Sequence, residues 1–154
     1  MYSIPRRQSG ATLVEMAIIA PVFLLVLVAI IELSMMFFAS LTMQYAVREG
    51  ARFAITGRSS ESTTGPQQRY ATIIAKIREN SVGMYDRVTP QISVNGTKYS
   101  TSTYNNGMFG APGDIVVIQV DCSWPVTTPL LSSVFTNGAY RFSVATTMRN
   151  EIFP

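Results

Sequence analysis

The feature that most restricts this chain is an apolar run that starts directly after Glu15. The sixteen residues of 16–31 carry no charge, and neither do the fifteen of 33–47, so Glu32 is the only charged residue in this run. A helix needs about 20 apolar residues to cross a bilayer. The run therefore predicts one membrane-spanning helix, with Met16 to Phe38 in the membrane and a continuation beyond the bilayer.

Two carboxylates and a proline mark the membrane part of this helix. At about 1.5 Å per residue, Glu15 and Glu32 lie about 26 Å apart, close to the roughly 30 Å thickness of the hydrocarbon core. Both carboxylates can thus sit near opposite interfaces. The alternative is a functional role, because an ionisable residue in a membrane segment is by default a candidate site. Pro21 removes one helical hydrogen bond and predicts a bend that membrane helices tolerate.

The part of the helix beyond the membrane points to assembly. If the membrane ends near Glu32, residues 33–41 emerge apolar on nearly every face, including Phe37 and Phe38. A helix that is apolar on every face is expected to be buried on every side by protein or lipid. A domain of about one hundred residues can cover one side, and we expect neighbouring helices to cover the rest.

Helix 11–56 is expected to end with charged residues and a glycine C-cap at Gly57. Near that end, Arg48, Glu49 and Arg52 form either a solvated face or a contact with a neighbouring subunit. A polar, glycine-punctuated loop is expected at 57–65.

The remainder, residues 66–154, predicts one external domain. A helix starting near Pro66 is indicated by apolar residues at helical spacing, namely Tyr70, Ile73, Ile74 and Ile77. Strand-like runs follow at 88–94, 98–103, 115–120 and 140–147. The fold class is therefore α+β: a long N-terminal transmembrane helix extends into a small domain with one amphipathic helix packed on a mostly antiparallel sheet.

Two loops of this domain carry specific expectations. Asn95-Gly96 predicts a tight hairpin turn between the first two strands. In the glycine-rich loop 105–113, Met108 and Phe109 either tuck onto the domain or form a contact tip for a partner.

Composition argues against several classes of function. The net charge of +3 falls to +1 without Arg6 and Arg7, which leaves no basic field for nucleic acid. The chain has no histidine, and its single cysteine, Cys122, lies in a strand-like run without an activating neighbour. The acidic residues are scattered, so we expect no enzyme, no cofactor, no metal site and no small-molecule substrate. Cys122 is expected to be buried.

The N-terminal residues resemble the leader of a prepilin. Arg6 and Arg7 precede Gly10, and Glu15 stands five residues after that glycine. Glycine has no side chain to obstruct a peptidase at the following bond. The resemblance implies that a prepilin peptidase removes residues 1–10, so that Ala11 becomes the first residue. It also implies that Glu15 of one subunit neutralises the new amino terminus of its neighbour.

Three stretches resemble the TadE-like family of pilin-related proteins of tight-adherence secretion systems: residues 10–32, YAVREGARFA at 45–54 and ATTMRNE at 145–151. The resemblance implies a minor pilin or pseudopilin in the bacterial inner membrane, with a cytoplasmic N-terminus and a periplasmic or extracellular domain. Implied partners are the prepilin peptidase, other pilin-like subunits, inner-membrane pilus assembly proteins and the lipid bilayer. The implied processes are pilus biogenesis, adhesion and secretion.

Two departures from the family pattern argue against the major subunit, since Met16 and Leu33 follow the two glutamates where an aromatic residue is usual. The alternative function is a membrane-anchored binding or chaperone module of the pilus machinery that never enters the filament.

Overall fold

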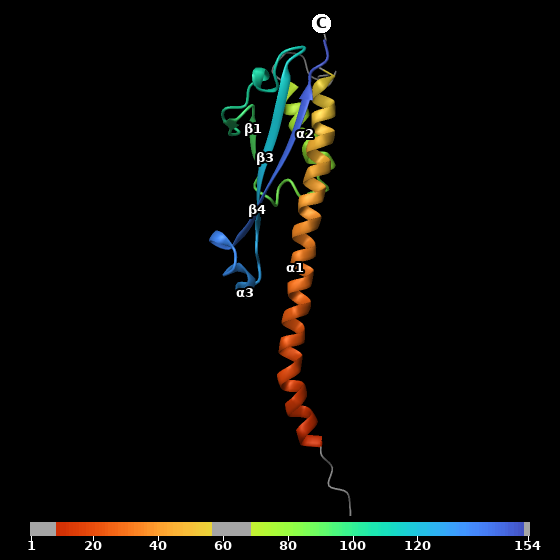
Figure 1. Ribbon diagram of the computed structural model, residues 1–154, viewed down its shortest axis with the longest axis vertical. Coiled ribbons are helices and arrows are strands. Elements are labelled where there is room, and N and C mark those ends of the chain that lie inside the picture. The colour runs from red at the N-terminus through yellow and green to blue at the C-terminus, as the bar shows by residue number, and fades with distance from the viewer. Residues whose placement is uncertain (1–8, 57–68, 153–154) are drawn as a thin grey trace, which may run out of the picture.

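A single long helix dominates the computed structural model, which describes residues 9–56 and 69–152. Helix α1 (Ser9–Ile55) has 47 residues, which at about 1.5 Å per residue extend about 70 Å. The head domain packs along its upper half, and the lower half projects from the head (Figure 1). The predicted helix is confirmed, and it continues through Pro21. The leader arginines, the loop 57–65 and Pro66 lie outside the described residues.

The head contains a second helix and a four-stranded sheet. Every pairing is antiparallel, in the order β2-β1-β3-β4, which confirms the predicted α+β class. Short helical turns occupy the loops. The elements are α2 (Arg69–Asn80), β1 (Gln91–Val94), β2 (Thr97–Tyr99), η2 (Asn106–Phe109), β3 (Ile115–Pro125), α3 (Pro129–Ser132), η3 (Thr136–Gly138) and β4 (Ala139–Arg149).

The central strands are longer than predicted, because β3 and β4 pair continuously from Ile115–Arg149 to Pro125–Ala139. The second half of β3 still alternates, with Cys122 and Trp124 buried. Strand β2 is shorter than predicted, since a turn begins at Ser100.

One face of the sheet forms the core with α1 and α2. The predicted stripe of α2 is confirmed: Ile73 and Ile77 are fully buried. Met108 and Phe109 are also buried, at 3% and 1% exposure, so the glycine-rich loop tucks onto the domain. The prediction that Cys122 is buried is likewise confirmed.

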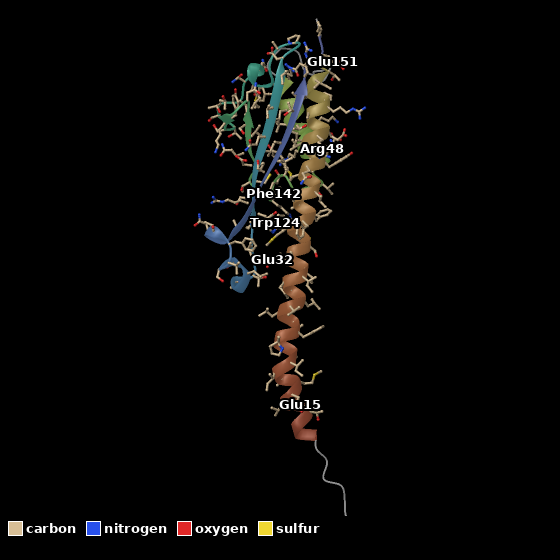
Figure 2. All side chains as sticks on the ribbon, in the orientation of Figure 1. Glu15, Glu32, Arg48, Trp124, Phe142 and Glu151 are labelled. Carbon is tan, nitrogen blue, oxygen red and sulfur yellow. The ribbon has the colours of Figure 1, made fainter. Side chains whose placement is uncertain are left out.

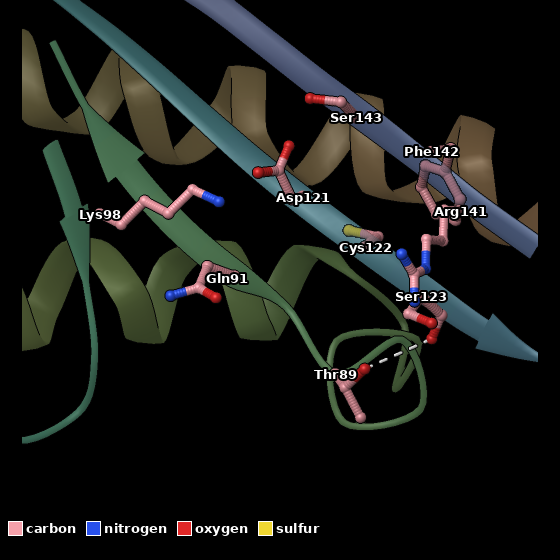
Figure 3. Close-up of a pocket in the computed structure, with 9 residues that line it drawn as sticks. All are labelled: Thr89, Gln91, Lys98, Asp121, Cys122, Ser123, Arg141, Phe142 and Ser143. Carbon is pink, nitrogen blue, oxygen red and sulfur yellow. Dashed lines mark hydrogen bonds between the residues drawn. The ribbon is translucent and has the colours of Figure 1, made fainter. Parts of the chain in front are cut away.

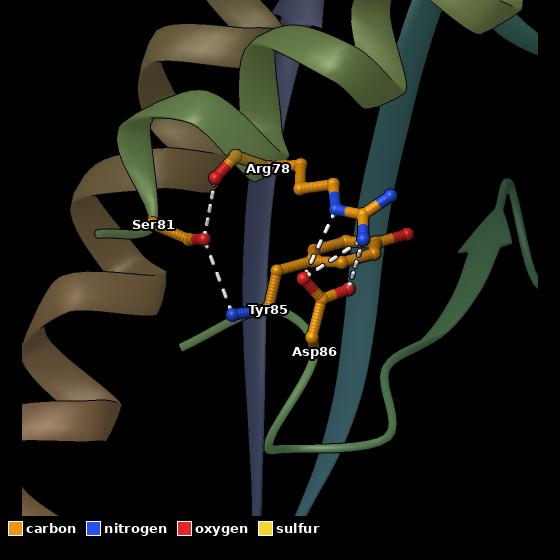
Figure 4. A network of polar contacts seen from close by, with 4 residues as sticks. All are labelled: Arg78, Ser81, Tyr85 and Asp86. Carbon is orange, nitrogen blue, oxygen red and sulfur yellow. Dashed lines mark hydrogen bonds and ion pairs between the residues drawn. The ribbon is translucent and has the colours of Figure 1, made fainter. Parts of the chain in front are cut away.

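Local polar contacts fix the turns of the head. Asn95 and Gly96 have φ of 49° and 81°, as a type I′ turn requires, which confirms the predicted hairpin. After α2, the Arg78 guanidinium pairs with Asp86, and the Ser81 hydroxyl donates to the Arg78 carbonyl and accepts from the Tyr85 amide (Figure 4). Burial raises the pKa of the Tyr85 phenol in this turn.

Candidate assembly surface of the N-terminal helix

The lower half of α1 is an exposed apolar rod. Every large apolar side chain from Leu13 to Ile31 is exposed, by 40% to 72%. In length and composition this is a helix that can cross a membrane, and the described residues contain one such helix. A long apolar N-terminal helix of this kind is consistent with a single-pass membrane anchor.

The predicted processing residues lie at the lower tip of α1. Arg6 and Arg7 are outside the described residues, while Gly10 and Ala11 belong to the first turn of the helix. No atom lies within 4 Å of the place where a Cβ on Gly10 would stand. A peptidase would therefore meet an uncrowded bond, but it would have to open a terminal turn whose first N–H groups lack helical partners.

Glu15 and Glu32, the two glutamates that flank or interrupt the apolar run, have different surroundings in α1. Glu15 is exposed, as is Pro21, and Glu15 lies near the tip of the rod, far from the head (Figure 2). Glu32 is only 7% exposed, because the head reaches down to cover it. Glu15 is thus open to a partner from outside, and Glu32 is a contact between helix and head.

The head holds one oxygen of the Glu32 carboxylate. Oε1 accepts hydrogen bonds from the Thr127 amide at 2.5 Å, the Thr128 amide at 3.3 Å and the Thr127 hydroxyl at 3.3 Å. Oε2 is buried and has no hydrogen-bond partner among the described residues. Sequence reasoning missed this contact, which joins residues 95 positions apart.

Above Glu32 the head covers one face of α1 and leaves the other open. The covered face carries small and flexible residues such as Ala39, Met43 and Ala46, all fully buried. The opposite face presents a row of large side chains that we call the outer stripe. Its members are Leu33, Phe37, Phe38, Leu41 and Tyr45, which are 42%, 64%, 46%, 65% and 57% exposed.

The charged residues near the end of α1 fall on both sides of this division. Arg48 and Arg52 are exposed and continue the direction of the outer stripe, while Glu49 is half-buried. The expectation that the head covers only one side of the emerging helix is confirmed.

A cavity of ≈ 520 Å³ on the sheet is a second candidate site besides the surface of α1 (Figure 3). It is lined by Thr89, Cys122 and polar residues of the strands, among them Lys98, Asp121 and Arg141. Burial, together with the nearby Asp121 carboxylate, raises the pKa of the Cys122 thiol to about 12. At neutral pH the sulfur is therefore a thiol, the weakly nucleophilic form. The described residues contain no group of three side chains suited to hold a metal ion.

Comparison with known proteins gives one match. No curated protein and no solved structure matches the chain. A family model described as TadE-like protein matches residues 10–52. The matched segment is α1 without Ser9 and without its last three residues, and it contains the rod, Glu15, Glu32 and the outer stripe. The stretch 145–151 lies outside the match and stays a prediction. Over residues 10–52, the predicted resemblance to the TadE-like family is confirmed.

Proposed function

We propose that this protein is a TadE-like minor pilin or pseudopilin, which works by assembling with other pilin-like subunits in or at the base of a tight-adherence pilus. The family match supports an association with such a pilus. The observation that carries the assembly role is the outer stripe, because it extends the exposed apolar surface of α1 beyond the length that a bilayer can cover.

The length of the exposed apolar part of α1 exceeds the length that a bilayer can cover. The nineteen residues from Leu13 to Ile31 extend about 28 Å on a helix, which fills a hydrocarbon core of about 30 Å. The outer stripe starts two residues later and continues to Tyr45, about 18 Å higher. Exposed apolar patches of this kind mark interaction sites. A helix of a second pilin-like subunit is the occupant that we propose.

The exposed Glu15 suits the same assembly. Removal of residues 1–10 would expose an α-amino group at Ala11, largely cationic at neutral pH. In apolar surroundings a paired charge costs far less than an isolated one. A Glu15 carboxylate that meets the amino terminus of a neighbour would fix the axial position of the two subunits. The proposed topology has the tip of α1 at the cytoplasmic face and the head outside the inner membrane.

Crosslinking tests the outer stripe directly. Because Cys122 is buried and protonated, a Phe37→Cys variant offers one reactive thiol for a thiol-directed photocrosslinker. We expect adducts with pilin-like subunits in cells. The matched control is Ile115→Cys, since Ile115 is 66% exposed on the head and Phe37 is 64% exposed on α1. Equal labelling of neighbours from both positions would contradict an interface at the outer stripe.

Glu15→Ala tests the pairing at the lower tip. We expect this variant to be inserted and cut, with Ala11 as its first residue by mass spectrometry, yet to be absent from the assembly. Glu79→Ala, at an exposed position of the head, is the control. Normal incorporation of Glu15→Ala would rule out the pairing. Finding the processed protein only in membrane fractions, never in sheared pili, would favour the anchored module instead.

A further inference from the structure

A second site lies where the head meets α1, at the level of Glu32. A groove of ≈ 370 Å³ opens there, between α1 and the segment that follows β3. Its α1 wall is formed by Val28, Ile31, Glu32 and Met35, and its head wall by Arg87, Trp124, Thr127 and Thr128. Figure 2 labels Glu32 and Trp124, which both line this groove, at the level where the head meets α1. Val28 and Ile31 belong to the exposed rod, so the groove opens toward the membrane side.

The groove contains a carboxylate that is only half satisfied. Glu32 is more than nine-tenths buried, and its Oε1 is held by the head, but Oε2 lacks a hydrogen-bond donor among the described residues. A buried charged oxygen without a partner is costly. A ligand that brings an N–H donor with a positive charge would satisfy it.

An opposite charge lines the same groove. Arg87 is exposed, and within the described part of the chain its guanidinium forms no ion pair. Guanidinium groups bind phosphate with two parallel hydrogen bonds. The groove thus offers a carboxylate and a guanidinium to one ligand, next to apolar walls.

The head segment beside the groove is suited to a membrane surface. We call residues 126–138, which join β3 to β4, the foot. From Cys122 to Tyr140 the chain carries no charge, and Val134 of the foot is 77% exposed. Phe135 of the foot packs edge-on against Tyr140, with the ring centroids 6.1 Å apart. Aromatic residues concentrate at membrane interfaces. The foot lies about 28 Å above Leu13, where the hydrocarbon core would end.

We infer that this groove binds the head group of phosphatidylethanolamine from the outer leaflet of the membrane that α1 crosses. The primary ammonium donates to Oε2 of Glu32, the phosphate accepts from Arg87, and the acyl chains run down along Val28 and Ile31. Phosphatidylcholine fits less well, because its quaternary ammonium has no N–H to donate. Phosphatidylglycerol lacks the cation. The inference rests on the proposed membrane anchorage of α1.

Trp124 gives a direct readout, because it is the only tryptophan of the chain and lines the groove. The full chain is reconstituted in vesicles that contain both lipids, with a nitroxide near the glycerol of either the phosphatidylethanolamine or the phosphatidylcholine. We expect labelled phosphatidylethanolamine to quench Trp124 with an apparent affinity about tenfold higher, the size expected for one charge-assisted hydrogen bond. Equal quenching by the two lipids would overturn the inference.

Three variants test which side chains of the groove bind the lipid head group. Glu32→Gln should abolish the tenfold preference, because it removes the carboxylate that binds the ammonium. Arg87→Gln, at an exposed position, should weaken the quenching by both lipids, because both carry the phosphate, whereas Arg48→Gln, an exposed arginine outside the groove, should change neither the affinities nor the preference. If Glu32→Gln does not fold, Arg87→Gln still tests the site, because an unchanged affinity for both lipids in that variant would overturn the inference. Flotation with the vesicles separates the two proposals. A chain that does not float contradicts the membrane anchor and the lipid site together, whereas a floating chain without lipid preference contradicts the lipid site alone.

Discussion

Gly50 is a point of close contact between α1 and α2, and it offers a sharp test of their packing. It lies in the REGAR part of the family-like stretch and is buried against α2. A Cβ on Gly50 would overlap the Ile77 Cγ1 atom and stand 3.1 Å from its Cδ1 and 3.5 Å from the Ile73 carbonyl oxygen. In Gly50→Ala, either the Ile77 side chain or the helix must shift.

Two contributions of opposite sign determine how much Gly50→Ala changes the free energy of unfolding. Adding a methyl group to a packed core costs about 1–3 kcal/mol. Replacing glycine by alanine inside a helix gains about 1 kcal/mol. We expect Gly50→Ala to lower the free energy of unfolding by about 0–2 kcal/mol in the native background.

Ile77→Ala removes the atoms that the new methyl group would meet. Alone, it should cost about 2–5 kcal/mol through the cavity that it leaves. In that background only the helix-propensity gain remains for Gly50→Ala, so the second substitution should stabilise by about 1 kcal/mol. Gly50→Ala should therefore destabilise the protein with isoleucine at position 77 and stabilise it with alanine there. This difference separates the contribution of the contact with Ile77 from that of helix propensity.

The assay is denaturant unfolding of the full chain in detergent, followed by Trp124 fluorescence for all four proteins of the cycle. Trp124 is 8% exposed in the folded head, so unfolding changes its surroundings. If Gly50→Ala has the same sign and size with isoleucine and with alanine at position 77, the two helices do not meet at Gly50 and the reasoning fails.

Three further predictions concern the head. Thiol reagents should modify Cys122 only after unfolding. Because the pKa of Cys122 is raised from 9.0 to about 12 in the folded protein, only the unfolded chain releases the thiol proton between these pH values, so the free energy of unfolding should fall as pH rises from about 9 to about 12. Replacing Arg69, whose guanidinium donates to the carbonyls of Gly110 at 2.7 Å and Ala54 at 3.1 Å, by alanine should cost about 1–3 kcal/mol in denaturant unfolding. Gly96→Ala, at a φ of 81°, should lower the unfolding midpoint by an amount equivalent to about 1–2 kcal/mol, and an unchanged midpoint would contradict the turn geometry.

Elements with a local cause were predictable from the sequence. The apolar run of α1, the helical spacing of Ile73 and Ile77 in α2, and the Asn95-Gly96 turn each specify a structure through residues that are neighbours in the chain. The strand-like run at 140–147 likewise predicted the position of β4, in which Val144 is 4% exposed.

Features that depend on long-range pairing were not predictable. The extra length of β3 and β4 comes from their mutual register, which no local pattern specifies. The contact of Glu32 with Thr127 depends on where the foot descends along α1. The sequence left Glu32 either near the membrane interface or in a functional role, because an ionisable residue in an apolar run is a candidate site. It could not show that the head supplies three donors to one oxygen of Glu32.

The head is attached to α1 at both ends of their common length, and this has a consequence for assembly. At the upper end, the Glu151 amide donates to the Ile55 carbonyl at 3.0 Å; at the lower end, the foot holds Glu32, about 35 Å away along the helix. Between these points the fully buried Met43 and Val47 face the head. A head fixed at two points cannot turn around α1 without breaking one attachment, so the outer stripe keeps one direction relative to the head. A neighbouring helix that packs on the outer stripe would therefore be placed at one angle around α1, and the same packing repeated would give subunits a defined rotation.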